Sequence, residues 1–198
     1  NKPRFSFLGK SVAFFTKGVS KLSHLILQTE RLLLREMTPL DLPDLREMLQ
    51  DSRVMYAYEG PFADEEVQLW LDRQFTRYRE DGIGLWAAVE RESGSMVGQV
   101  GLTWQDADGA RVLEVGYLLK YRFWHKGYAA EAARGCADYA FRQMGADRVY
   151  SIIRDSNIPS QKVARRNGMQ PEFTFVKHYR GVDMPHIVFS VSREDFYR

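Results

Sequence analysis

The stretch from Leu113 to Met144 constrains the fold most, because two different hydrophobic periods follow each other within it. Apolar residues alternate with other residues as far as Leu119, which is the pattern of a β-strand. After a short basic and aromatic loop, small and apolar residues recur at helical spacing from Ala129 onward, as on one helix face. Gly145 stands where a glycine commonly ends a helix. The stretch therefore predicts a strand, a tight turn and a helix.

The turn between this strand and this helix has features of a phosphate-binding loop, although a single glycine is a weak signal. A helix start leaves several backbone N–H groups without partners, and the helix dipole places partial positive charge there. Little side-chain bulk at Gly127 and Ala129 would let a phosphate approach these groups. A plain crossover, in which Gly127 only eases the turn, explains the spacing equally well.

Composition limits the classes of protein to which the chain can belong. Its 198 residues suit one domain, or one domain with an extension, and 44% apolar residues are enough for a core. A net charge of +2 argues against nucleic-acid binding, and no apolar run reaches the ~18 residues of a membrane span. The single cysteine, Cys136, excludes an internal disulfide and is expected in the core. Because His24, His178 and His186 lack metal-ligand spacing, no metal site is predicted.

The first 24 residues differ from the rest of the chain. They carry four lysines and one arginine with interspersed aromatic residues, whereas the first acidic residue is Glu30. Such an arm is compatible with a helix on a membrane surface, a targeting segment, a partner-binding arm or a loosely packed extension. The predicted organisation is a basic extension over residues 1–24 and one domain over residues 25–198, and we assign the extension no chemistry.

Periodicity and turn residues predict the other elements of the domain. Thr38 and Pro39 have the sequence of a helix start, and Glu92-Ser93-Gly94 indicates a hairpin. Beyond the central stretch, strands are expected at residues 25–37, 84–91, 95–105, 148–154, 173–180 and 184–191, helices from residues 38, 63 and 159, and a loop at residues 51–62. This order predicts an α/β (α+β) fold with a mixed sheet.

A second motif follows the strand at residues 148–154. Asn157 and Ser160 stand at the start of a short helix, Pro159 suits its first turn, and Gly168 suits its end. This run defines several positions within a short stretch, so it is more specific than the turn around Gly127.

These runs resemble two motifs of the GNAT family of N-acetyltransferases. The first family motif reads Gln or Arg, two residues, Gly, one residue, and Gly or Ala, and Gly127 and Ala129 match its last two defined positions. Trp124 stands where Gln or Arg is usual, and His125 replaces a small or basic residue. The run around Asn157 is similar to the family's second motif. The resemblance extends roughly from Leu27 to Phe196.

The resemblance implies a fold and a co-substrate. Family members have a mixed, mostly antiparallel sheet of about seven strands with helices on both faces and a splayed central strand pair that admits acetyl-CoA. In the family, backbone N–H groups of the first motif bind the pyrophosphate, and the fourth strand pairs with the pantetheine arm. The candidate acetyl-CoA-binding residues are Leu118, Leu119, Trp124, His125, Lys126, Gly127, Tyr128, Ala129, Asn157 and Ser160. Core packing would also explain Tyr128, a solvated loop would explain His125 and Lys126, and an ordinary helix start would explain Ser160.

The residues also suggest a catalytic set. No serine nucleophile motif stands out, so direct attack by a neutral amine is simpler than an acyl-enzyme. Glu114 is a candidate base for the amine proton, although a solvent-facing or ion-paired glutamate explains it equally well. The resemblance implies that Ser160 lies near the CoA sulfur and that Asn157 supports the splayed strand. Candidate acceptor-binding residues, which a surface loop would also explain, are Tyr56, Tyr58 and Glu59.

The predicted function is acetyl transfer from acetyl-CoA to a primary amine, most like the branch that acetylates the N-termini of ribosomal proteins. That branch has residues similar to Glu172, His178, Arg180, Gly181 and Asp183. Two alternatives stay open: acetylation of a small amine such as a polyamine, antibiotic or amino acid, and a non-catalytic module that binds acyl-CoA. The expected partners are acetyl-CoA and the amine acceptor, and the expected location is the cytoplasm. The sequence leaves a homodimer open.

Overall fold

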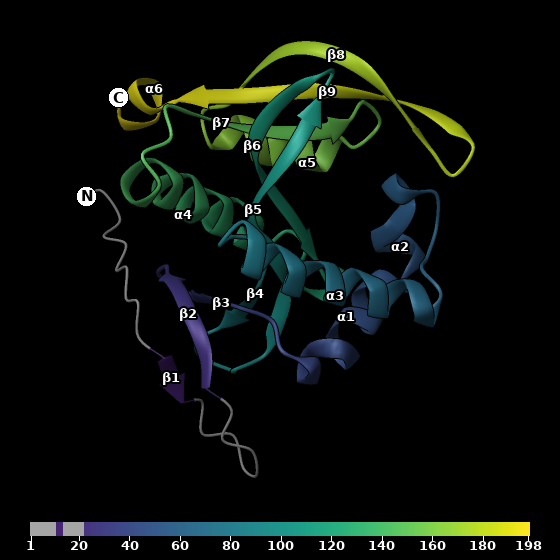
Figure 1. Cartoon of the computed structure of the whole chain (residues 1–198), viewed down its shortest axis with the longest axis vertical. Helices are drawn as coiled ribbons and strands as arrows, with labels where there is room; N and C mark the ends of the chain where they lie inside the picture. Colours follow the sequence, from purple (N-terminus) through teal and green to yellow (C-terminus); the bar gives the residue numbers. More distant parts are fainter. Residues whose placement is uncertain (1–10, 14–21) are drawn as a thin grey trace.

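The computed structural model describes residues 11–13 and 22–198, which form a sheet covered by helices (Figure 1). Its strands are β1 (Ser11–Ala13), β2 (Leu22–Gln28), β3 (Leu32–Arg35), β4 (Leu85–Glu90), β5 (Met96–Ala107), β6 (Ala110–Leu119), β7 (Arg148–Arg154), β8 (Gln170–Tyr179) and β9 (Val182–Ser192). The α-helices are α1 (Leu42–Leu49), α2 (Ser52–Met55), α3 (Asp64–Glu80), α4 (Tyr128–Gln143), α5 (Ile158–Arg166) and α6 (Arg193–Tyr197). Three short 3-10 helices are described, η1 (Pro39–Asp41), η2 (Tyr56–Tyr58) and η3 (Tyr121–Phe123).

The strands of this described part form one sheet in the order β1-β2-β3-β4-β5-β6-β7-β9-β8. Neighbouring strands are antiparallel except β6 and β7, which run parallel. This architecture confirms the predicted α/β fold with a mixed, mostly antiparallel sheet. The sheet has more strands than expected, because residues 25–37 contribute to two of them and β1 adds one at the edge.

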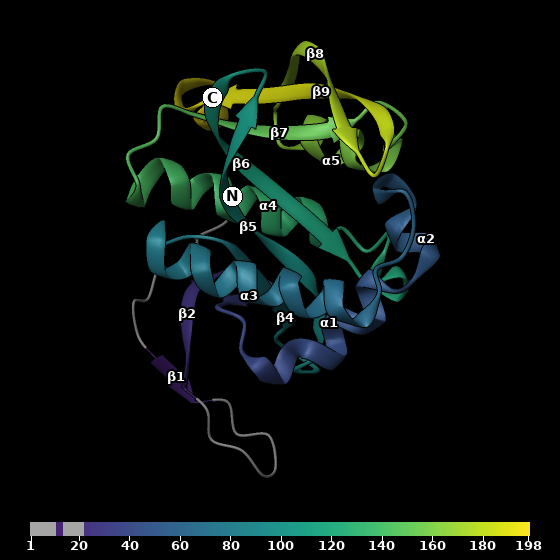
Figure 2. The same ribbon diagram turned by 45° about the vertical axis from the view of Figure 1, so that its right-hand side comes forward.

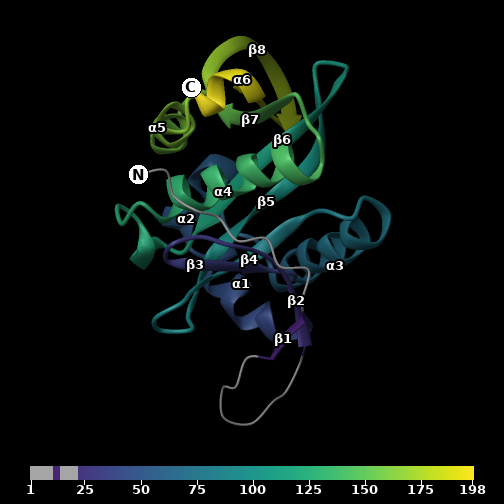
Figure 3. The ribbon, with the colours of Figure 1, turned by 90° about the vertical axis from the view of Figure 1, so that its left-hand side faces the viewer.

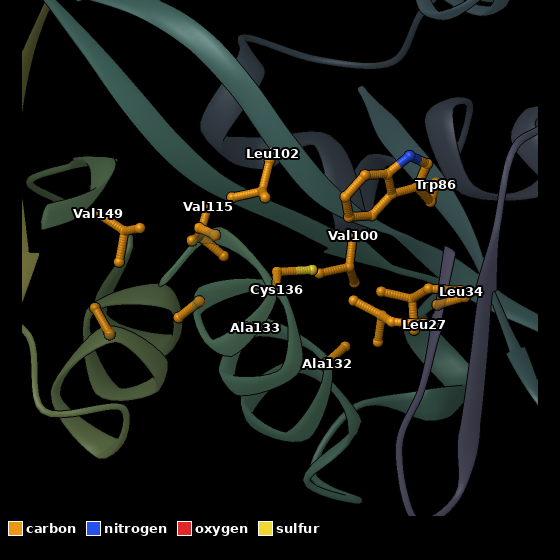
Figure 4. Close-up of a cluster of buried hydrophobic side chains, with 14 of the residues drawn as sticks. Leu27, Leu34, Trp86, Val100, Leu102, Val115, Ala132, Ala133, Cys136 and Val149 are labelled. Atoms are coloured by element: carbon orange, nitrogen blue, oxygen red, sulfur yellow. The ribbon is translucent and has the colours of Figure 1, made fainter. Parts of the chain in front are cut away.

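Each face of the sheet has its own hydrophobic core, because successive side chains of a strand point to opposite faces. In β4, Trp86 packs on the face covered by α4, whereas Leu85 packs on the face covered by α1 and α3. Figures 2 and 3 show α3 and α4 on opposite sides of the central strands. Figure 4 shows Cys136 of α4 beside Val100, where its side chain is fully buried. Cys136 is therefore a core residue, as predicted.

The prediction of one strand over residues 25–37 was wrong. The chain instead turns at Thr29 and returns as β3, which pairs antiparallel with β2. The Thr29 hydroxyl accepts a hydrogen bond from the Leu32 N–H at 3.0 Å and donates one to Glu131 at 2.6 Å. A long-range partner on α4 thus holds the turn, and apolar periodicity carries no sign of it. Of the predicted extension, residues 1–10 and 14–21 lie outside the described residues.

Two short helices were also missed. The predicted loop over residues 51–62 contains α2, which begins where the Asp51 side chain accepts a hydrogen bond from the Arg53 N–H at 3.0 Å. The chain ends in α6, where the Ser192 hydroxyl accepts a hydrogen bond from the Asp195 N–H at 3.1 Å. Both helices are too short to show a hydrophobic period, so their capping residues were the only sequence signal for them.

A buried lysine attaches the end of β6 to α1. The Lys120 side chain is 2% exposed, and its ammonium group bonds to Asp44 and lies 2.6 Å from Glu47. Both carboxylates belong to α1, and Glu47 also binds the more exposed Arg122. Because Lys120 begins the loop that leads to Gly127, this ion-pair cluster positions the loop.

We expect Lys120→Met to lower the free energy of unfolding by about 2 kcal/mol, which is below the cost for fully buried pairs because both carboxylates retain water contact. Methionine has a similar volume, so the loss reports the missing ammonium group. Urea denaturation measures this loss, and Arg122→Gln is the matched control, with an expected loss below ~1 kcal/mol. Equal losses in the two variants would contradict the positioning role of the buried lysine.

Candidate active site

A cavity of about 560 Å³ lies between α3, the ends of β6 and β7, and the hairpin formed by β8 and β9. Alternate residues of β6 line it from both faces of the sheet: Glu114 and Gly116 from the α3 face, and Val115 and Tyr117 from the α4 face. Both faces of β6 can border one cavity where the adjacent strand, β7, is no longer paired with it. The described register pairs β6 with β7 at Glu114 and Tyr150. The two strands therefore diverge beyond this point, and the cavity lies at this opening.

Glu114 lies where the strands begin to diverge. Its carboxylate accepts a hydrogen bond from the Ile152 N–H at 3.2 Å and one from the Thr103 hydroxyl at 3.4 Å. Thr103 faces Glu114 across the β5–β6 ladder and in turn accepts a hydrogen bond from the Gln105 amide at 3.1 Å. Burial raises the pKa of Glu114 above its ordinary value, because the cavity disfavours the charged form. A carboxyl group with a raised pKa is suited to accepting a proton.

The start of α5 forms a second side of the cavity. The Asn157 side-chain oxygen caps this helix by accepting a hydrogen bond from the Ser160 N–H at 3.2 Å. The same oxygen accepts a hydrogen bond from the Tyr56 hydroxyl at 2.8 Å. From β6, the Tyr117 hydroxyl donates to the Ser160 carbonyl at 2.8 Å and so bridges the diverging elements. The structure thus brings Tyr56 to Asn157 and Ser160, from which it lies far away in the sequence.

The other two candidate acceptor residues take different positions. Tyr58 lines the cavity with its ring edge-on to Trp70, at a centroid distance of 6.4 Å, and burial raises the pKa of Tyr58 to about 12. Glu59 does not line the cavity, since its carboxylate forms an ion pair with Arg154 of β7. The residues of η2 therefore join α2 to the β7–α5 segment.

The β8–β9 hairpin covers the outer end of the cavity. Its turn comes down beside α2 (Figure 2), and Arg180 in this turn forms an ion pair with Glu66 at the start of α3. The Arg180 guanidinium also lies over the Phe62 ring, 5.2 Å from its centroid. Lys177 and His186 line the cavity from this hairpin, and burial lowers the pKa of His186. The hairpin therefore limits the size of any molecule that reaches Glu114.

The loop before α4 has the backbone shape of an anion-binding turn. Gly127 has a φ of +82° and His125 a φ of +61°, so two residues lie in the left-handed region before a helix of 16 residues. The first intrahelical hydrogen bond runs from the Glu131 N–H to the Gly127 carbonyl. The N–H groups of residues 128–130 thus precede the first helical hydrogen bond and can bind a pyrophosphate. These features fit the phosphates of CoA.

Arg31, which directly precedes β3, supports this loop. Its guanidinium donates to the Lys126 carbonyl at 2.9 Å and to the Glu131 carboxylate at 2.6 Å. A Cβ added at Gly127 would lie 3.4 Å from this guanidinium, so the loop and Arg31 are closely packed. Sequence reasoning missed Arg31 and Glu131, because their pairing spans a long sequence separation.

Trp124 and Tyr128 face the protein, whereas Tyr121 near the start of the loop is exposed. The Trp124 indole N–H donates to the Leu119 carbonyl at 2.9 Å, and the Tyr128 hydroxyl donates to Glu90 beneath the Arg31 guanidinium. Leu118 lines the cavity, whereas Leu119 is buried, and Ala129 packs against the core. Within residues 124–129, the exposed side chains are those of His125 and Lys126. Binding through the loop therefore depends on its backbone and on these two basic side chains.

Further cavity residues escaped the sequence analysis. Glu66, Trp70, Arg73 and Arg77 all line the cavity from α3. Their three- and four-residue spacing places them on one helix face, so helical periodicity was a usable signal. Thr103 and Gln105 had no such signal, because their part in the site depends on the register of β5 against β6.

Comparison with known proteins identifies the family. The acetyltransferase (GNAT) domain matches residues 31–170. The chain belongs to the GNAT acetyltransferase family. It is 33% identical over 152 residues to the uncharacterised protein YkkB of Bacillus subtilis, which covers 76% of this chain and 88% of that protein. The uncharacterised N-acetyltransferase YnaD of the same species is 29% identical over 150 residues, covering 75% and 85% of the two chains.

Solved GNAT structures share the fold. RimL, a ribosomal alpha-N-protein acetyltransferase, superimposes with a TM-score of 0.74 over 89% of this chain and 98% of its own, at 16% identity. As a GNAT protein, the chain is an acetyl-CoA-dependent acetyltransferase. No helix in the described part of this GNAT chain is long and apolar enough to cross a membrane.

Proposed function

We propose that this acetyltransferase moves the acetyl group of acetyl-CoA to a primary amine by direct attack, with Glu114 accepting the amine proton. One observation carries the proposal: the cavity lies where β6 and β7 diverge, β6 residues of both sheet faces line it, and Glu114 lies at this point. Acetyl-CoA can then approach from the α4 face and the amine from the α3 face. The opening allows the two substrates to meet without either crossing the sheet.

The residues of this chain suit each part of the binding step. The backbone of residues 125–129 would hold the pyrophosphate, because these residues combine left-handed turns with a helix start. Leu118 and Asn157 line the cavity along which the pantetheine arm would extend, and Leu119 follows at the end of β6. Ser160 lines the cavity and has a hydroxyl group that can hydrogen-bond the thiolate.

The proposed transfer balances in atoms and charge. The neutral amine forms an N–C bond to the acetyl carbon, the C–S bond breaks, and the amine proton passes to Glu114. The sulfur leaves as a thiolate, which Ser160 stabilises, and a proton from solvent completes the CoA thiol. Acetyl-CoA supplies the activated acyl group, and Glu114 then returns its proton to water. The products are the acetylated amine and CoA.

An α-amine is the acceptor class that this site suits best. At pH 7 an α-amine is neutral about a tenth of the time, whereas a lysine amine is neutral on the order of one part in a few thousand. A larger fraction of an α-amine is therefore already neutral and ready to attack, so it needs a weaker base than a lysine amine does. The likeness of the fold to RimL supports a peptide N-terminus as the first acceptor to test, with Tyr58 on the cavity wall beside it.

Thermal unfolding with and without acetyl-CoA tests the cofactor site. At a hundred times its dissociation constant, acetyl-CoA should stabilise the protein by about 2.7 kcal/mol, which is on the order of five to ten degrees. Thiol release from acetyl-CoA in the presence of peptide N-termini then measures turnover. A missing thermal shift at saturating acetyl-CoA, or binding without thiol release for every amine supplied, would refute the proposal.

A further inference from the structure

Three cations line the acceptor side of the cavity without a carboxylate partner. Arg73 and Arg77 extend from α3, and Lys177 extends from β8 on the opposite wall. Among the residues that the structure describes, none of the three forms an ion pair. Their contacts are a 3.3 Å hydrogen bond from Arg77 to the Gln74 side chain, and aromatic rings beside Arg73 and Lys177.

Two other charged residues that line the cavity, Arg154 and Glu66, do form ion pairs. Arg154 pairs with Glu59, and Glu66 pairs with Arg180. Among the described residues that line the cavity, Glu114 is then the remaining carboxylate, and the charges of Lys177 and Arg77 act on it. Arg77 also interacts with Asp81, which does not line the cavity. The described cavity lining therefore has three cations without an ion-pair partner and one such carboxylate, so the acceptor side keeps an excess of positive charge.

This excess of positive charge destabilises the protein when no anion is bound. Arg77 is half-buried, and burial together with the neighbouring charge of Arg73 lowers the pKa of its guanidinium. A positive charge in a partly dehydrated cavity is stabilised when a hydrogen-bonded anion joins it. A second cation entering the same cavity would instead be repelled.

We infer that the acceptor is an amine that also carries an acidic group, a carboxylate or phosphate, which Arg73, Arg77 and Lys177 bind while the amine faces Glu114. The inference rests on the proposed function and narrows its substrate class. Polyamines and other polycationic amines are then poor acceptors. A free acidic amino acid and a peptide N-terminus with an acidic side chain share the required chemistry.

Thiol release from acetyl-CoA with matched amines tests this inference. One arm compares free glutamate with free glutamine, a second compares peptides that begin Ser-Asp with peptides that begin Ser-Asn, and spermidine represents the polycations. We expect kcat/KM to be tenfold to a hundredfold higher for the acidic member of at least one pair, and lowest for spermidine. The arm that shows the preference identifies the source of the acidic group.

Two variants connect the preference to these cations. Arg77→Gln and Lys177→Gln should each reduce the acidic-to-neutral ratio about tenfold, mainly by raising KM for the acidic amine. Arg79→Gln is the matched control on the same helix, because Arg79 is exposed, does not line the cavity and donates to Thr76. It should keep the wild-type ratio, and a thermal shift with acetyl-CoA shows that each variant is folded.

The outcomes separate this inference from the proposed function. Acetylation of neutral amines or spermidine at least as fast as acidic amines would overturn the inference and leave the acetyl-transfer proposal intact. An acidic preference that survives both cavity variants would also overturn the assignment to these cations. No thiol release with any amine would refute the proposed function, and the inference with it.

Discussion

Replacing Glu114 with glutamine is expected to lower kcat/KM by about 10²- to 10⁴-fold, because glutamine cannot accept the amine proton. Glutamine has nearly the same shape: its oxygen can accept the hydrogen bond from the Ile152 N–H, and its amide nitrogen can donate to the Thr103 hydroxyl. The thermal shift with acetyl-CoA should therefore persist. Thiol-release kinetics measure the change, and Glu92→Gln in the exposed turn after β4 is the matched control.

The pH dependence gives a second test of the same residue. Because burial raises the pKa of Glu114, the wild-type rate should rise with pH through this raised pKa, and Glu114→Gln should lose that limb. The positive charges of Lys177 and Arg77 lower the pKa of Glu114 and so partly offset the effect of burial. A variant that keeps both the rate and the pH profile of the wild type would contradict the role of Glu114 as base.

Stability should change in the opposite direction from activity. A carboxyl group whose pKa is higher in the folded state binds its proton more tightly there, so its contribution to stability is lost as pH rises through that pKa. At pH values above this raised pKa, the ionised Glu114 therefore destabilises the fold, and Glu114→Gln should raise the melting temperature above that of the wild type. Below the ordinary pKa of a glutamate, the difference should disappear.

Gly127→Ala is expected to weaken acetyl-CoA binding at least tenfold. Gly127 has a φ of +82°, and an added Cβ would lie in the loop before α4, 3.4 Å from the Arg31 guanidinium. Tenfold weaker binding lowers the stabilisation at a fixed acetyl-CoA concentration from about 2.7 to about 1.4 kcal/mol. The melting-temperature shift caused by acetyl-CoA should therefore fall to about half of its wild-type value.

Gly109→Ala separates the loss of binding from backbone strain. Gly109 has a φ of +85° in the turn between β5 and β6, and an added Cβ would contact nothing there. Both alanine variants should lose about 1–2 kcal/mol of stability from the left-handed conformation. Only Gly127→Ala should also lose part of the acetyl-CoA shift, and equal shifts in the two variants would show that the loop does not bind the phosphates.

The sequence by itself determined the central architecture of this protein. The change from a two-residue to a helical period after Leu119 predicted β6 and α4, and the run around Asn157 predicted the start of α5. These elements depend on local spacing, capping and turn residues, which a linear pattern records directly. The same reasoning failed at residues 25–37, where the turn at Thr29 depends on Glu131, a distant partner.

Only the tertiary structure decided which side chains form the site. Tyr56 meets Asn157 across a long sequence separation, and Thr103 faces Glu114 because of strand register. The unpaired positive charge of Arg77 and Lys177 likewise depends on where the distant carboxylates lie. Charge balance and contact across elements are properties of three-dimensional packing, because residues far apart in the chain determine them. The reaction class is therefore readable from local motifs, whereas acceptor choice belongs to the folded cavity.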